Sequence, residues 1–212
     1  MADHASRIDY IIEKHTITEK SESPAISGQW QKVLAECQQQ RLGSEERLLL
    51  ALRSVDYVTS FELPFRLLLI RTPQLIDSIR QELTVHSKLT TINNGKRGTV
   101  YSLKPDFSGV PDTFHYQRSG KIRRLDGGEL TADRYVGIAR QTTEPRNRLR
   151  LAFTSGLKVT ALDALLFFGV QRVASDVSAL RREGLNIALQ HVNTFDSATQ
   201  VVRSMPVYFV EH

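Results

Sequence analysis

The stretch VTALDALLFFGVQRVASDVSALRREG, residues 159–184, decides the fold expected for this chain. It predicts a short apolar helix, a tight connection and a second, more polar helix with one apolar seam. Val173, Val177 and Leu180 in that second helix recur at i, i+4 and i+7, the spacing of one helix face. Thr160, followed by Asp163, has the spacing of a capping box, so we expect the first helix to begin there.

The chain contains this pattern twice. Residues 48–83 lie ungapped over residues 149–184, and the identical pairs include Thr59/Thr160 and Arg71/Arg172. In both copies we expect an amphipathic helix, a capped second helix and a third helix. The earlier copy carries Pro64 within its second helix, where proline removes an intrahelical hydrogen bond, so this copy is predicted to be degenerate.

A hairpin is predicted after each third helix. In the first copy Asn94–Gly95 supplies turn chemistry, with Lys96 and Arg97 at the tip. In the second copy a longer loop with an acidic tip, residues 193–199, separates two strands, and Arg203 lies on the return strand. Three helices followed by a hairpin is the element order of a winged helix-turn-helix domain.

The run TALDALLFFGVQRVASDVSALRREGLNI resembles the small helix-turn-helix domains of bacteriophage and plasmid proteins. Those domains have a similar T.LEAL..FG..RLA..I..LR..G pattern, and Ala174, Val177, Leu180, Arg181 and Gly184 match it in this sequence. The resemblance covers roughly the last third of the chain. It implies that this part binds duplex DNA.

The expected fold class is therefore α+β, mainly α, with tandem winged helix-turn-helix domains joined by a basic connector. We expect a flexible arm over residues 1–27, a first domain with a preceding helix over 28–103, the connector over 104–141 and a second domain over 142–212. Within the connector, FHYQRSGKIRRLDGGEL predicts a hairpin turning at RSG. Four basic residues would be displayed near that turn: Arg118, Lys121, Arg123 and Arg124.

Composition narrows the function classes. Hydrophobic residues make up 41% and charged residues 24%, which is typical of globular proteins, and the formal net charge is +5. The single cysteine excludes an internal disulfide framework, and no signal peptide or membrane-spanning run is found. The sequence thus predicts a soluble cytoplasmic protein (nucleoid-associated if bacterial) without a metal, cofactor or small-molecule ligand. No catalytic motif is present, so we do not expect an enzyme.

The leading hypothesis is sequence-specific binding of double-stranded DNA by a transcriptional regulator of a phage, plasmid or other mobile element. Each third helix would read a major groove, and basic residues would contact flanking phosphates. The residues expected to contact DNA are Arg71, Thr72, Gln74, Ser78, Lys96, Arg97, Arg118, Lys121, Arg123, Arg124, Gln171, Arg172, Ser175, Ser178, Arg182 and Arg203.

Two alternatives stay open at this point. The first is a plasmid replication or partition factor that binds iterated DNA sites. The second is a protein–protein interaction module, in which the third helices pack on partners and Leu75 is an exposed anchor. A homodimer is compatible with each of these functions.

Overall fold

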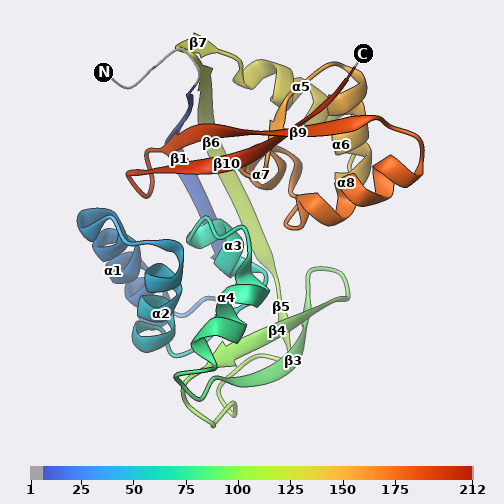
Figure 1. Cartoon of the computed structure of the whole chain (residues 1–212). Helices are drawn as coiled ribbons and strands as arrows, with labels where there is room; N and C mark the ends of the chain where they lie inside the picture. Colours follow the sequence, from blue (N-terminus) through green and yellow to red (C-terminus); the bar gives the residue numbers. More distant parts are fainter. Residues whose placement is uncertain (1–6, 212) are drawn as a thin grey trace. The chain divides into compact units, whose positions relative to one another are not determined.

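The structure, a computed structural model, describes residues 7–211. It is a mixed α/β fold, 39% helical and 32% strand, with one six-stranded and one four-stranded sheet (Figure 1). The predicted fold class, mainly α with tandem winged helices, is therefore wrong. The chain divides into unit 1, residues 1–14 with 120–212, and unit 2, residues 15–119, and the division falls inside two strands.

Unit 2 holds the first copy of the repeat. Its four-stranded sheet has the order β2-β4-β3-β5, with β5 parallel to β3. The helices enclose a core centred on Trp30, Leu48, Leu63 and Ile76. The elements are α1 (Pro24–Gln40), α2 (Ser44–Ser54), β2 (Val58–Thr59), α3 (Glu62–Arg66), α4 (Thr72–Ile79), β3 (His86–Ile92), β4 (Lys96–Ser102) and β5 (Thr113–Phe114).

Unit 1 holds the second copy, and its elements follow in the same order. The six-stranded sheet has the order β7-β6-β1-β9-β10-β8. The elements are β7 (Glu129–Leu130), α5 (Ala132–Gln141), α6 (Pro145–Thr154), β8 (Val159–Thr160), α7 (Ala161–Asp163) with the π-helical turn η2 (Ala164–Phe168), α8 (Val173–Arg182), β9 (Ile187–Asp196) and β10 (Val201–Val210).

Two long strands differ from the predicted organisation, namely β1 (Ile8–Glu19) and β6 (Tyr116–Asp126). Strand β1 lies in the segment expected to be a flexible arm, of which residues 1–6 fall outside the described part. In unit 1, β1 pairs in parallel with β9, because Ile8 and Tyr10 are buried apolar residues at alternating positions. Burial of these apolar residues orders β1, although the polar residues that follow it led to the prediction of a flexible arm.

The predicted hairpin in the connector is also wrong. The RSG sequence lies inside the continuous strand β6, and the chain turns instead at Gly127 and Gly128, where β6 meets β7. Both glycines have positive φ, 57° and 94°, which other residues adopt only with strain. The hairpin predicted at Asn94–Gly95 is confirmed, since β3 pairs antiparallel with β4 and Ile92 is opposite Lys96.

Both predicted capping boxes are present. The Asp163 amide donates to Thr160 Oγ1 over 3.0 Å, and the Thr160 amide donates to the Asp163 carboxylate over 2.9 Å. Glu62 and Thr59 exchange the same two hydrogen bonds. Each capping threonine also bonds a buried tyrosine from a long strand, namely Tyr10 in unit 1 at 2.6 Å and Tyr116 in unit 2 at 2.8 Å.

Candidate nucleic-acid interface

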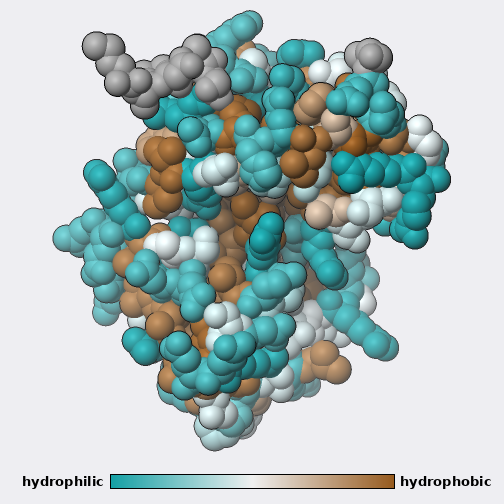
Figure 2. Space-filling view, in the orientation of Figure 1, coloured by the Kyte–Doolittle hydropathy of each residue, from teal (hydrophilic) through white to brown (hydrophobic). Residues whose placement is uncertain are grey.

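Helix α8 presents a polar face opposite a buried seam. Val173, Val177 and Leu180 are buried as predicted, which turns the other side of the helix to solvent. Arg172, at the N-cap position, and Arg182, in the last turn, are exposed at opposite ends of this face. In the part of the chain that the structure describes, neither arginine side chain has a hydrogen-bond or ion-pair partner. In Figure 2, near-white and teal residues lie over α8.

The carboxylates of α8 and of its C-cap residue, Glu183, are neutralised by arginines from α6. Arg146 Nε lies 3.0 Å from Asp176 Oδ1, and Arg150 pairs with Glu183. Arg146 and Arg150 are one helical turn apart, so both lie on the face of α6 beside α8. The acidic residues of α8 therefore do not cancel the charge of Arg172 and Arg182.

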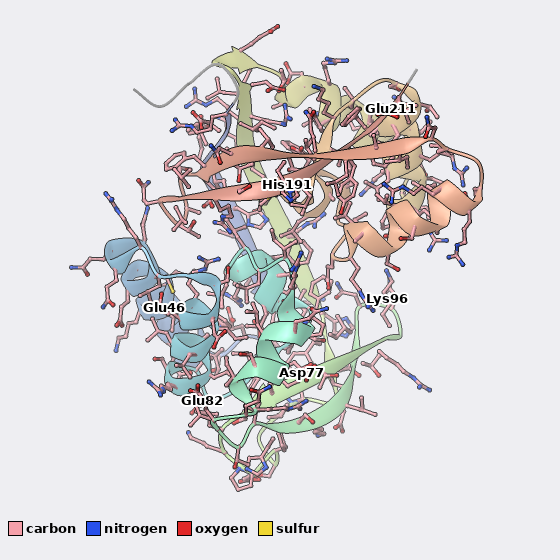
Figure 3. All side chains as sticks on the ribbon, in the orientation of Figure 1. Glu46, Asp77, Glu82, Lys96, His191 and Glu211 are labelled. Atoms are coloured by element: carbon pink, nitrogen blue, oxygen red, sulfur yellow. The ribbon has the colours of Figure 1, made fainter. Side chains whose placement is uncertain are left out.

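The equivalent surface in unit 2 has a different charge. Residues 144–154 and 171–184 around α8 contain six arginines and three carboxylates, whereas the aligned residues 43–53 and 70–83 contain four of each. Glu46, Asp77 and Glu82 are marked in Figure 3 on and around α2 and α4. Arg47, one of the four arginines, is buried and donates to the carbonyls of Leu67 and Leu42. The surface around α4 thus has no excess of arginine over carboxylate.

Most of the predicted DNA contacts are solvent-accessible. Exposed residues are Arg71, Gln74, Lys96, Arg97, Arg118, Lys121, Arg123, Arg172, Ser175, Ser178 and Arg182, and partly exposed residues are Ser78, Gln171 and Arg203. These residues are distributed over the two units of the chain. Lys96 and Arg97 lie at the tip of the β3–β4 hairpin, where Figure 3 marks Lys96.

Two predicted contacts are buried, so the prediction is wrong for them. The hydroxyl of Thr72 is enclosed in the seam of α4. Arg124 is 0% exposed, and its Nε donates to Asp163 Oδ1 over 2.9 Å. Burial disfavours the charged guanidinium, but the carboxylate of Asp163 outweighs this, and the pKa of Arg124 is raised. Arg124 points inward because strand residues alternate between faces.

Other predicted contacts are engaged by neighbouring side chains. Lys121 and Arg123 both bind Glu13 of β1, at 2.9 and 2.8 Å, and the hydrogen bond from Lys121 is the main cause that lowers the pKa of Glu13. The guanidinium of Arg118 lies 4.7 Å from the ring centroid of Phe65. These exposed contacts are weak, and they leave the cations within reach of solvent.

The acidic tip expected on the second hairpin is also wrong. Asp196 is buried, accepts from the Thr199 amide and hydroxyl, and binds Arg203. Strand β9 extends to Asp196, so the turn is shorter than predicted. Ser197 in this turn donates its amide to the Tyr10 carbonyl, which holds the turn against β1. The side chain of Arg203 is therefore bound to residues of the turn.

Arg146 and Arg150 were not among the residues predicted from the sequence to contribute to the site. Their i, i+4 spacing in PRNRLRLAFT places them on one helix face, and that signal was available. This spacing does not indicate which side of α6 packs beside α8. The carboxylates they bind, Asp176 and Glu183, lie far along the chain, so the pairing is a product of the tertiary structure.

Comparisons with protein-family models, with curated proteins and with solved structures found no match to this chain. Across residues 7–211, no group of three or more histidine, cysteine or acidic residues is placed to hold a metal ion. None of the helices in the same range has the length and apolar character needed to cross a membrane.

Proposed function

We propose that this chain binds double-stranded DNA and that the exposed face of α8 is its principal contact. The observation that carries the proposal is the local excess of arginine over carboxylate around α8. Because Asp176 and Glu183 are paired with arginines of α6, they do not cancel the charges of Arg172 and Arg182. Positive charge on an exposed helix suits the phosphate-lined major groove, which is wide enough to admit a helix.

The polar residues between the two arginines could read base edges. Ser175 is exposed and one turn from Arg172, and Ser178 is exposed although its hydroxyl also donates to the Ala174 carbonyl. Serine hydroxyls can bond either purines or pyrimidines, so the arginines would supply most of the discrimination. Binding without catalysis is the activity proposed.

Unit 2 would contribute less through its helix. The surface around α4 has no excess of arginine over carboxylate and gains little from phosphates, although Arg71 is exposed, like Arg172. Lys96 and Arg97 at the β3–β4 tip would contact flanking backbone. Leu75, expected as an exposed anchor for a protein partner, is half-buried against the unit 2 core, which weakens the interaction-module alternative.

The decisive experiment selects binding sites from random duplexes with the full chain, followed by titration of the selected duplex. Arg172→Ala should reduce affinity by about 1–3 kcal/mol and relax specificity at one position. Arg71→Ala, the matched change at the aligned residue of the other copy, should have a smaller effect. Failure of the wild-type chain to bind any duplex at low salt would refute the proposal.

On the basis of the sequence resemblance, we propose that this binding serves transcriptional regulation by a protein of a phage, plasmid or other mobile element. A replication or partition factor would bind the same kind of duplex at several adjacent sites. Quantitative footprinting on the selected genomic region separates these roles, because iterated protected sites would support the replication or partition factor.

A further inference from the structure

In both units a parallel strand, here called the closing strand, pairs with the first strand of the hairpin. In unit 2 this strand is β5, which lies parallel to β3 with Phe114 opposite Ile92 and follows the β3–β4 hairpin in the chain. In unit 1 it is β1, which lies parallel to β9 with Tyr10 opposite Asp196, although β1 precedes both copies of the repeat. The same place in the two units is therefore taken by segments from different positions in the chain.

The residue after the first hairpin strand binds the closing segment in the same way in both units. In unit 2 the Asn93 amide donates to the Phe114 carbonyl over 2.9 Å, and Asn93 Oδ1 accepts from the amide two residues further along over 2.7 Å. In unit 1 the Ser197 amide donates to the Tyr10 carbonyl over 2.9 Å, and Ser197 Oγ accepts from the amide two residues further along over 2.7 Å. Strand β1 thus replaces, in unit 1, the segment that follows the hairpin in unit 2.

The tyrosine of the closing segment completes the capping box. Tyr10 Oη lies 2.6 Å from Thr160 Oγ1, and both residues are 0% exposed. Thr160 Oγ1 also lies 3.1 Å from Asp163 Oδ2 and accepts from the Asp163 amide. The Asp163 carboxylate, paired with Arg124, only accepts, so the single hydrogen of the Thr160 hydroxyl is donated to it. Tyr10 is therefore the donor to Thr160 Oγ1.

This cap lies at the start of the path that leads to α8. Residues 161–168 form α7 and η2, and all of their side chains are buried. Gly169 then turns the chain, and Arg172 stands at the N-cap position of α8. A buried polar atom that loses a hydrogen-bond partner is costly, so loss of the Tyr10 hydroxyl should loosen the cap and the helices that follow it.

We infer that β1 is the closing strand of the second copy and that Tyr10 is a positioning residue for the α8 surface. Duplex binding at α8 then depends on a segment outside the repeat, through a side chain that is too buried to touch DNA. This dependence rests on the proposed function, whereas the hold of Tyr10 on the helices does not. Tyr116, which makes the matching bond to Thr59 in unit 2, provides the control.

Hydrogen exchange of the full chain, followed at single amides by NMR without DNA, tests the hold of Tyr10. Tyr10→Phe should speed exchange of the Asp163 amide and of the Ser175 amide in the first turn of α8 roughly tenfold more than exchange of the Glu62 amide. Tyr116→Phe should favour the Glu62 amide instead. Equal acceleration in both units would overturn the inference, and so would a change at Asp163 that does not extend to α8.

Titration of the selected duplex tests the consequence for binding, at a temperature where circular dichroism shows both variants folded. Tyr10→Phe should weaken affinity roughly fivefold or more, whereas Tyr116→Phe should change it by less than about twofold. Both variants lose one buried tyrosine hydroxyl, so a general loss of stability would lower affinity in both. Equal losses would therefore mean that Tyr10 has no positioning role.

Ser197→Ala keeps the test decisive should Tyr10→Phe fail to fold. It removes the side-chain acceptor of the Ile12 amide and should speed exchange at Asp163 in the same direction, less strongly; unchanged exchange would overturn the inference. A wild-type chain that binds no duplex would refute the proposed function, and the exchange rates alone would then decide the role of Tyr10. Full duplex binding by Tyr10→Phe would refute the positioning role and leave the proposed function intact.

Discussion

Leu68 and Gly169 occupy aligned positions in the two copies of the repeat, and both adopt a left-handed backbone, with φ of 50° and 73°. Each follows the second helix of its copy and turns the chain toward the third. Leu68 is 2% exposed, so burial of its side chain offsets the backbone strain that a glycine avoids. The two copies thus form the same left-handed turn with two different residues.

Gly169→Ala should destabilise the protein by about 1–2 kcal/mol, because the added Cβ disfavours a left-handed backbone. Chemical denaturation measures the change in the free energy of unfolding. Gly137→Ala is the matched control, since Gly137 lies within helix α5, and a Cβ there meets nothing within 4 Å. That control should be stabilised by up to about 1 kcal/mol, and a stabilised Gly169→Ala would contradict the argument.

Arg124→Ala should cost about 3–5 kcal/mol of stability, because it leaves the buried carboxylate of Asp163 without its cation. Arg123→Ala, at the next residue, removes an exposed ion pair with Glu13 and should cost about 1 kcal/mol or less. Thermal and chemical unfolding measure both changes. Equal losses for the two variants would contradict the burial of Arg124.

Arg146→Ala should weaken DNA binding although Arg146 need not touch DNA. The change frees the carboxylate of Asp176 on α8, which then repels phosphates. Asp176→Ala in the same chain should restore most of the lost affinity, and titrations of the two single variants and the double variant measure the coupling. Additive effects of the two changes would mean that Arg146 contacts DNA directly.

Protonation of His15 should destabilise the fold in mild acid. Desolvation, with the charge of Arg118, lowers the pKa of His15 from 6.5 to about 4, and its Nε2 has no hydrogen-bond partner among the described residues. The native state therefore binds fewer protons than the unfolded state between these values. The stability contributed by the neutral imidazole is complete above pH 6.5 and is lost as the pH falls toward 4, by about 3 kcal/mol.

His15→Gln removes this titration and keeps a hydrogen-bond donor. The free energy of unfolding of the wild-type chain, minus that of the variant, should fall as the pH drops from 6.5 to 4. Burial raises the pKa of Glu62 to about 7, which gives the opposite slope, but Glu62 is present in both chains and cancels in the difference. A difference that does not change with pH would contradict the assignment to His15.

The sequence by itself determined the local features of this protein. The repeat, the capping boxes at Thr59 and Thr160, the seam of Val173, Val177 and Leu180 and the turn at Asn94–Gly95 could all be predicted. Apart from the repeat, each depends on residues less than ten positions apart, where side-chain size, hydrogen-bonding groups and helical period act directly. The same reasoning located the exposed face of α8.

The strand pairings and the burial of individual charged residues were decided only by the tertiary structure. Strand β1 is ordered through pairing with β9, almost the whole chain away, and local composition cannot report such a partner. Arg123 and Arg124 are adjacent in a basic run, yet one is exposed and the other is buried, because Asp163 and the ring of Tyr135 enclose the second. Charge is visible in a sequence, whereas its cancellation by distant carboxylates depends on which faces pack together.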